Sequence, residues 1–592
     1  MSIIESDNRV VPLQAPELLG ADMVLDSFLR HGVEHVFIFP GGTIAPILDR
    51  IEKRSRIEIV CPRTEQGAGY AALGYGRITG KTAVFMVTSG PGVTNAVTPI
   101  ADAYYDNIPL VVITGQVGTA DMRGDLPVKQ RGFQEVDTIA LMRPITKAAF
   151  LVKDILDLPN VMEQAFFLAR SGRQGPVVVD LPMNVQRGTC AGDAFAIEKH
   201  SEIVPFVPAD KIETLAQWIM QAERPVILAG GGVIASGANR ELRALAERYS
   251  IPVTMSMPGM GAYPSRGALS LGLCGYAGSQ YANMAMYKSD LLIGVGTTFH
   301  LRQTGSLPER TVEKGRIARI DLDANELRHS RVPLDLEINA DAKASLAALD
   351  RALPRPSDKT ADWLNLIMAW KARYPLVTGK SGKLPKPQNV IAAVNIAVQG
   401  RRVIVTTGVG QHQVWVPRHF DFASPERVLL TSSGHGTMGF DLPAAIGAKI
   451  ADPEATVICF VGDGSLQMNI QELATIVERQ IDIKIVVLDN HALSIVAQFQ
   501  RQNWKSHPST GDKYNPDFAA IAEAYGIAGV SITSKTGMAE KLRAALARKG
   551  PVLIHCHVDP KEDLLPMLLG GHTLDDMSNE WSFALASPGW RW

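Results

Sequence analysis

The 592-residue sequence has few cysteines and no excess of charge of either sign. Its cysteines lie far apart, and none belongs to a CxxC pair: Cys61, Cys190, Cys274, Cys459 and Cys556. This spacing argues against a disulfide framework or a structural zinc site and is typical of a reducing compartment. Lysine and arginine number 59 against 60 aspartates and glutamates, a net charge of -1. We therefore expect neither nucleic acid nor an anionic membrane as a partner.

Long hydrophobic runs are also missing. No apolar run approaches the roughly 18 residues that a membrane helix needs. The first residues, MSIIESDNRVVPLQAPEL, lack the basic-then-apolar arrangement of a secretory signal, and we interpret residues 1–16 as an N-terminal tail. The sequence therefore predicts a cytoplasmic protein without a membrane segment.

What the sequence does contain is a regular alternation of two patterns. Short apolar runs such as HVFIF, PVVVDLP, DLLIGVG and IKIVVLDN are separated by segments of helical periodicity such as NIQELATIVERQ. This alternation is typical of βαβ units with buried parallel strands. Residues 186–210 and 353–388 lose the periodicity and read as linkers. We therefore predict an α/β protein of three stacked, doubly wound parallel-sheet domains.

The strongest chemical motif lies in the third of these blocks. Asp463, in Gly462-Asp463-Gly464, and Asn490 each follow an apolar strand, and 27 residues separate them. That distance suits one helix and one strand, so both residues can lie at the same sheet edge, where α/β sheets bind ligands. Each motif alone would be an ordinary turn. Together they offer hard oxygen ligands for Mg²⁺ and a backbone approach to a diphosphate.

This pair resembles the motif of thiamine-diphosphate enzymes, and the chain from about residue 17 to 570 resembles the acetohydroxyacid (acetolactate) synthase group. The likeness rests on ordered motifs that include FPGGTIAPILD, TEQGAGYAALGYGRITGK, TTGVGQHQVW, SSGHGTMGFDLPAAIGAK and GDGSLQMNIQELATI. It implies a pyrimidine-binding domain at 17–186, a central, FAD-binding-like domain at 205–352 and a diphosphate-binding domain at 385–560. Residues 561–592 would be a C-terminal tail over the site.

The resemblance also implies a role for individual residues. Glu65 would activate the cofactor, Gln134 would lie near the reacting carbon, and Met438 would prop the cofactor into its bent shape. The backbone of Gly436 would accept a hydrogen bond from the cofactor's amino group. Further cofactor contacts would come from Pro91, Asn95, Val409, Gly410, Gln411, His412, Gly462, Gly464 and Ser465. The metal ligands would be Asp463, Asn490 and the main-chain carbonyl of Ala492.

The central domain carries mixed signals for a second cofactor. The residues that fit FAD in the group are Gly230, Gly231, Gly232, Ser256, Met257 and Asp321. Against them, Thr298 stands where an arginine would contact FAD, His300 replaces an acid and Ala277 replaces a histidine. The sequence leaves two alternatives for the central domain: it binds FAD, or its pocket is empty.

The acceptor side departs further from the group. Arg302 matches the arginine that meets the carboxylate of an acceptor keto acid, a role suited to its planar charged fork. Phe499, however, stands where the group has tryptophan, His435 where it commonly has an apolar residue, and the loop from Gly118 to Gly132 is longer.

The resemblance therefore implies decarboxylation of a 2-oxo acid, pyruvate, and carboligation of the resulting enamine to a second carbonyl, with thiamine diphosphate and Mg²⁺ as cofactors. The alternative is a 2-oxo acid decarboxylase, with His435 in acid–base work, or a carboligase with an aldehyde or other keto acceptor. A flavin or nicotinamide oxidoreductase and a non-catalytic scaffold are more distant readings. A homodimer or homotetramer with sites at the subunit interface is also implied. The acceptor and any regulatory subunit are not determined.

Overall fold

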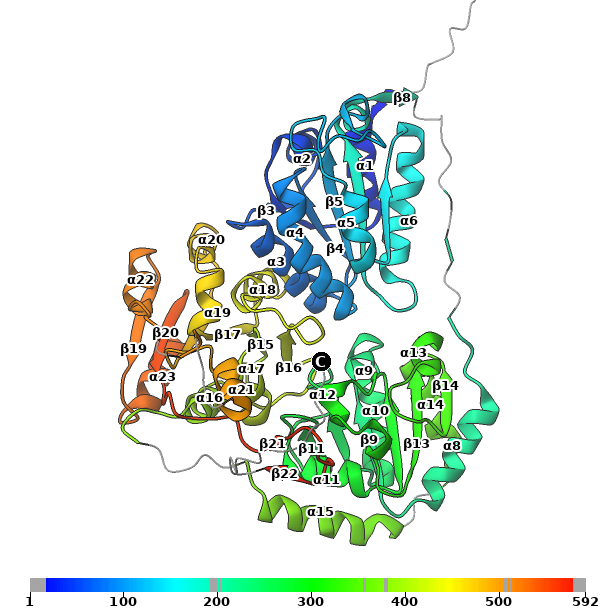
Figure 1. Cartoon of the computed structure of the whole chain (residues 1–592), viewed down its shortest axis with the longest axis vertical. Coiled ribbons are helices and arrows are strands. Elements are labelled where there is room, and N and C mark those ends of the chain that lie inside the picture. Colours follow the sequence, from blue (N-terminus) through cyan, green and yellow to red (C-terminus); the bar gives the residue numbers. More distant parts are fainter. Residues whose placement is uncertain are drawn as a thin grey trace, which may run out of the picture. The chain divides into compact units, whose positions relative to one another are not determined.

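The computed structural model describes residues 17–191, 198, 200–201, 204–354, 358–376, 382–504, 509–511 and 513–578. The tail predicted at 1–16, and residues 579–592 of the tail predicted over the site, lie outside the described residues. Three six-stranded sheets, in which every strand pairing is parallel, confirm the predicted α/β class. Helices cover both faces of each sheet (Figure 1). No helix in the described ranges is both long and apolar enough to cross a membrane.

The chain divides into two compact units, one of residues 1–69, 82–104 and 109–201 and one of residues 70–81, 105–108 and 202–592. The sheet of the first unit has the strand order β3-β2-β4-β5-β7-β6. Its strands are β2 (His35–Phe39), β3 (Glu58–Val60), β4 (Ala83–Val87), β5 (Leu110–Gln116), β6 (Ala148–Leu151) and β7 (Pro176–Pro182). The helices that begin in it are α1 (Gly20–Arg30), α2 (Ala45–Arg54), α3 (Glu65–Thr79), α4 (Pro91–Tyr105), α5 (Thr138–Met142), α6 (Leu158–Arg170) and α7 (Met183–Arg187). Strands β1 (Glu17–Leu19) and β8 (Thr189–Ala191) pair antiparallel beside it.

The second unit contains two sheets, and the first of them has the order β11-β10-β9-β12-β13-β14. This is the strand order of dinucleotide-binding α/β domains, whose ligand crevice lies where the order reverses, here between β9 and β12. The strands are β9 (Pro225–Ala229), β10 (Val253–Met255), β11 (Ser270–Leu273), β12 (Leu291–Val295), β13 (Arg316–Asp321) and β14 (Leu336–Asn339). The helices are α8 (Ala209–Gln221), α9 (Gly231–Ala235), α10 (Asn239–Tyr249), α11 (Gln280–Lys288), α12 (Leu301–Thr304), α13 (Ala324–Arg328), α14 (Ala342–Ala352) and α15 (Ala361–Arg373).

The other sheet of the second unit has the order β16-β15-β17-β18-β20-β19, which reverses between β15 and β17. Its strands are β15 (Val403–Thr407), β16 (Arg427–Thr431), β17 (Thr456–Gly462), β18 (Ile483–Asp489), β19 (Ala528–Ile532) and β20 (Val552–His557). The helices are α16 (Pro387–Ala397), α17 (Gln411–His419), α18 (Asp441–Ala451), α19 (Asp463–Met468), α20 (Glu472–Glu478), α21 (Ser494–Trp504), α22 (Phe518–Ala524) and α23 (Met538–Ala547). All seven residues of β18 are buried, as a strand covered on both faces requires.

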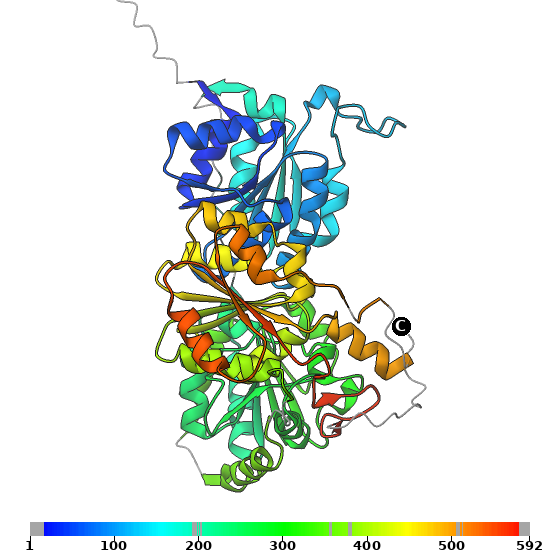
Figure 2. The same ribbon diagram turned by 90° about the vertical axis from the view of Figure 1, so that its left-hand side faces the viewer.

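Two segments differ from the sequence interpretation. Residues 353–388, read as a linker, include helix α15, because Trp363 and Ile367 stand at helical spacing and both are buried in the core of the central domain. The described part of the C-terminal tail forms a hairpin of β21 (Met567–Leu568) and β22 (Met577–Ser578), which lies beside the central sheet (Figure 2). Leu568 and Leu574 join the same core cluster. The domain boundaries at 17–186, 205–352 and 385–560 stay predictions.

Candidate active site

Asp463 and Asn490 lie at the carboxyl ends of neighbouring parallel strands. Gly462 of β17 pairs with Leu488 of β18, so the two strands end at the same level and the residues that follow them are brought together. Their exposed fractions are only 4% and 7%. The structure therefore brings Asp463 and Asn490 to the same edge of the sheet, as the sequence predicts.

A hydrogen-bond network around Asp489 supports this pair, and sequence reasoning did not find it. The Asn515 amide donates to Asp463 Oδ2 (2.6 Å) and to Asp489 Oδ1 (2.7 Å). Burial raises the pKa of Asp463 to about 6, although the hydrogen bond from Asn515 acts against it. Burial also acts to raise the pKa of Asp489, but hydrogen bonds from His555, the backbone of His491 and Asn515 outweigh it and hold the value at about 2. Asp489 is thus a fixed negative charge next to Asn490.

The loop after β15 meets the start of α19 through a second buried carboxylate, Asp441. Its Oδ2 accepts hydrogen bonds from the Ser465 hydroxyl (2.8 Å) and the Gly408 amide (3.1 Å), and it lies 3.6 Å from His412 Nε2. A Cβ on Gly410 would lie 2.7 Å from His412 Nδ1, so this turn needs glycine to make room for the imidazole. Asp441 thus joins the loops on either side of the point where the strand order reverses.

Two further loops reach the same edge of this sheet. The backbone amides of Gly436 and Thr437 donate to Ser432 Oγ, and Val409 donates its amide to Thr437 O at 3.3 Å. Gly436 has a φ of +80°, which favours glycine. A Cβ on Gly464 would lie 3.4 Å from the Met438 side chain, so Met438 faces the Gly462–Gly464 turn. The carbonyl of Ala492 accepts a hydrogen bond from the Ser494 hydroxyl (3.1 Å).

In the first unit, Glu65 and Asn95 come together from two helices. Glu65 begins α3 and is 8% exposed, and its Oε2 accepts a hydrogen bond from the Asn95 amide (3.1 Å). Pro91 begins α4, one turn before Asn95. Gln134 has a φ of +62°, and its backbone packs so closely on Gly90 that a Cβ there would lie 2.9 Å away. The predicted residues of this unit therefore surround the amino end of α4.

The residues predicted to bind the acceptor substrate lie far apart in the sequence, on helices and a loop that belong to different domains. Arg302 is an exposed residue of α12, whose start is capped by His300 through a 3.3 Å hydrogen bond to the Arg302 amide. Phe499 lies on α21 and packs edge-on against Trp504. His435 is exposed and stacks on Tyr105, with ring centres 5.4 Å apart. Below it, Asp106 holds the loop by accepting from the Ser433 and Gly434 amides.

The glycine cluster of the central domain has a packing role. Gly230 and Gly232 lie against the turn after β12, and a Cβ on either would come within 2.7 Å of Gly296. Ser256 is buried and accepts a hydrogen bond from the Gly259 amide, while Met257 is half-buried. Asp321 is held by the buried Arg319 at 2.6 Å. Close packing thus explains Gly230 and Gly232 without a ligand, and Asp321 already has Arg319 as its ion-pair partner.

Comparison with protein families first identifies the class. Residues 19–141 match the N-terminal TPP binding domain of thiamine pyrophosphate enzymes, residues 212–349 their central domain, and residues 408–556 their C-terminal TPP binding domain. The fold and these matches define a thiamine pyrophosphate enzyme.

Comparison with individual proteins narrows the class. The mitochondrial acetolactate synthase of Schizosaccharomyces pombe is 38% identical over 94% of this chain and 85% of that protein. The acetolactate synthase large subunits of Parasynechococcus marenigrum and Lactococcus lactis are 39% and 38% identical, over 94% of this chain and 90% and 96% of theirs. The chain belongs to the acetolactate synthase family of thiamine pyrophosphate enzymes, which confirms the resemblance. It is a thiamine-pyrophosphate-dependent enzyme that forms carbon–carbon bonds.

Proposed function

We propose that this enzyme is an acetolactate synthase: it decarboxylates pyruvate and joins the two-carbon fragment to a second 2-oxo acid. The observation that carries the proposal is the pair Asp463 and Asn490 at the carboxyl ends of the neighbouring strands β17 and β18, next to the reversal of strand order, in a chain whose relatives are acetolactate synthases. Bound thiamine diphosphate supplies the carbanion chemistry, and the protein supplies binding, orientation and proton control.

The residues present fit a diphosphate and its cation. Asp463, Asn490 and the Ala492 carbonyl are hard oxygen donors of the kind that Mg²⁺ prefers. Across the crevice, Gln411 Oε1 is buried yet makes no hydrogen bond with other described residues, as expected of a group that faces a ligand. His412 holds its Nε2 3.6 Å from Asp441 and its Nδ1 against the Gly410 turn. We propose that Mg²⁺ binds the first set, and that Val409, Gly410, His412 and Ser465 line the diphosphate.

We propose that Glu65 exchanges a proton with the pyrimidine ring of the cofactor, with Asn95 orienting its carboxylate. A carboxylate that is nearly buried and held by an amide is suited to proton exchange at a fixed atom. Met438 supports the cofactor from the side of Gly464, and the Gly436 carbonyl accepts from its amino group. Pro91 and Gln134 line the pyrimidine side.

Two further parts of the proposal rest on the family. The central domain has the strand order of a dinucleotide-binding fold, which favours FAD, while the salt bridge of Asp321 to Arg319 occupies the acid that a ribose would need. FAD therefore stays a prediction. We also propose at least a homodimer, because in the family the first domain of one subunit completes the site of another.

Substitution of Arg302 tests which acceptor substrate the enzyme uses. We propose that the guanidinium of Arg302 binds the carboxylate of the second 2-oxo acid, because the side chain is exposed and its planar donor fork matches a carboxylate. In Arg302→Ala, pyruvate decarboxylation should continue while acetolactate formation falls about tenfold to a hundredfold, the value of one charge-assisted hydrogen bond of roughly 1.5–3 kcal/mol. Mass spectrometry of the products from pyruvate measures acetolactate against acetaldehyde.

Arg328→Ala is the matched control, since Arg328 is an exposed arginine on the neighbouring helix α13. An unchanged product ratio in Arg302→Ala would contradict a keto-acid acceptor. It would favour the second candidate, a decarboxylase or aldehyde carboligase in which the exposed His435 acts as acid or base.

A further inference from the structure

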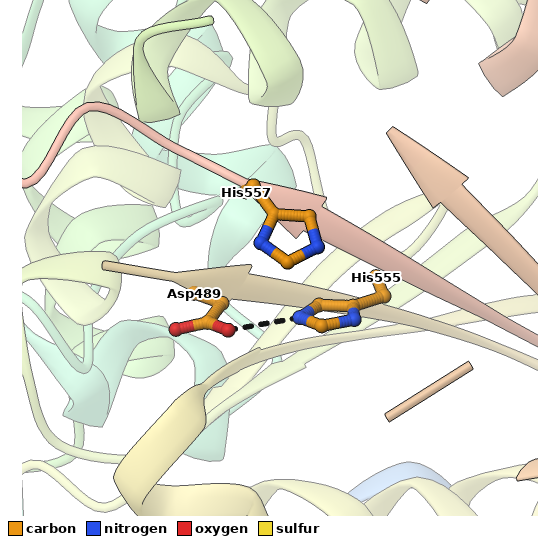
Figure 3. Close-up of side chains that lie close together, drawn as sticks. All are labelled: Asp489, His555 and His557. Carbon is orange, nitrogen blue, oxygen red and sulfur yellow. Dashed lines mark hydrogen bonds and ion pairs between the residues drawn. The ribbon is translucent and has the colours of Figure 1, made fainter. Parts of the chain in front are cut away.

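A cluster of three side chains lies on one face of the sheet that contains β17 and β18. Asp489 ends β18, and His555 and His557 belong to the next strand, β20. Asp489 pairs with His557 in the parallel register of β18 and β20, and Val487 pairs with His555. Because alternate residues of a strand point to the same face, the two histidines and the aspartate share that face. Figure 3 shows the three side chains converging, and one ligand atom from each lies within 4.8 Å of the others.

We propose that Asp489, His555 and His557 form a binding site for a divalent transition-metal ion such as Zn²⁺ or Co²⁺. Two imidazoles and one carboxylate are a ligand set that these ions bind with three protein ligands and an open position for water. This ion is distinct from the proposed Mg²⁺, because the site at Asp463 and Asn490 offers only oxygen ligands.

The spacing of the donor atoms suits such an ion. His555 Nε2 lies 2.8 Å from Asp489 Oδ2, and His555 is 1% exposed. Two ligands at about 2.0–2.1 Å from one tetrahedral ion lie about 3.3 Å apart, so half an ångström of adjustment admits the metal. The metal takes the place of the hydrogen-bonding proton between these two atoms.

A second carboxylate stands behind His555, where the displaced proton can go. His555 Nδ1 lies 3.5 Å from Asp517 Oδ1, which is long for a hydrogen bond. When Nε2 binds the metal, the proton moves to Nδ1 and Asp517 becomes its acceptor. A metal-bound histidine almost always donates its other N–H to such a partner.

The Asp489 carboxylate separates the two ions by using one oxygen on each side. Its Oδ1 accepts from Asn515 and from the His491 amide, on the side of Asp463. Its Oδ2 faces His555 alone among the contacts within the described residues. The transition metal therefore need not displace Asn515 or the proposed Mg²⁺ ligands.

Titration of the full-length protein with Co²⁺ tests the site, because a four- or five-coordinate Co²⁺ absorbs visible light far more strongly than the hydrated ion. We expect one such Co²⁺ per chain. His557→Gln should weaken its binding more than tenfold. Asp517→Asn removes the negative charge behind His555 but keeps an acceptor oxygen, so it should weaken binding by up to about tenfold. Asparagine caps a helix as well as aspartate, so α22 keeps its start.

Two controls complete the test. His329→Gln removes an exposed histidine of the central domain and should leave Co²⁺ binding unchanged. Asp463→Ala should also retain the visible bands; their loss in this variant would place the ion at the oxygen site and overturn the proposal. Bands that are absent from the wild type, or unchanged in a folded His557→Gln protein, would show that the three side chains form only a hydrogen-bonded cluster.

Discussion

Single residues at the carboxyl ends of the strands carry the proposed chemistry, and Asp463 is the most direct to test. Asp463→Ala removes a metal ligand, so the diphosphate would face the site without its bridging cation. We expect binding of thiamine diphosphate in the presence of Mg²⁺ to be lost. Titration calorimetry measures it, with Asp350→Ala as the control, because Asp350 is a partly exposed aspartate of α14 that pairs with Arg248. Unchanged affinity would remove Asp463 from the site.

Glu65 is tested separately, because its role is proton transfer and not binding. In Glu65→Gln the amide still accepts the hydrogen bond from Asn95 but cannot exchange a proton. We expect cofactor binding to persist while hydrogen–deuterium exchange at C2 of the cofactor slows by about 10²–10⁴. Nuclear magnetic resonance follows the exchange, and a wild-type rate would contradict the assignment.

At this scale the sequence predicted the residues that stand in short motifs. Asp463 and Asn490 lie together because one helix and one strand separate them, and that distance is visible in the sequence. Asn515 lies 52 residues from Asp463, and no local pattern links the two. Asp441 was equally hidden, since a buried aspartate at the start of a helix looks like an ordinary first-turn acid.

At the scale of elements, Arg418 ties three segments together. Its buried guanidinium donates to the carbonyls of Ala277 and Gly278, which follow β11, and to those of Leu565 and Pro566, which precede β21. Helix α17, which begins at the proposed diphosphate loop, is thereby held to the central domain and to the C-terminal segment.

We expect Arg418→Lys to destabilise the second unit by at least about 3 kcal/mol. Lysine keeps the charge but offers a single nitrogen, so it leaves several buried carbonyls without the donors of a charged fork. Denaturant unfolding followed by tryptophan fluorescence measures the loss. Arg402→Lys is the control, because Arg402 is half exposed in a surface pair with Asp452 and should cost less than about 1 kcal/mol. Equal effects of the two changes would contradict this role.

At the scale of the whole molecule, the two units offer an internal comparison of stability. All eight tryptophans stand at position 218 or later, so tryptophan fluorescence reports on the second unit, while circular dichroism reports on both. The first unit contains Asp180, whose pKa burial raises to about 7 against hydrogen bonds from Thr114 and Gln116. The unfolded value is about 3.9.

At a pH between these two pKa values, Asp180 holds a proton in the folded state that it has lost in the unfolded state. The stability of the first unit should therefore fall as pH rises from about 4 to about 7, by up to about 4 kcal/mol. Denaturant midpoints by circular dichroism at pH 5 and 8 should show the fall, and its loss in an Asp180 variant distinguishes it from the titration of groups in the second unit such as Asp463. Asp180→Asn, which cannot ionise, should flatten the dependence; an equal slope in this variant would refute Asp180 as its cause.

By itself, the sequence determined the fold class and the family, because strand and helix periodicities and motifs such as GDG with its distant asparagine are local patterns. It also predicted which loops carry the site. The tertiary structure alone decided which strands are neighbours, and so brought Asn515 to Asp463, Arg418 to the C-terminal segment, and His555 and His557 to Asp489. The physical reason is that spacing along a chain constrains contacts within one βαβ unit. Contacts between distant units depend on the strand order, which the packing of the whole sheet sets.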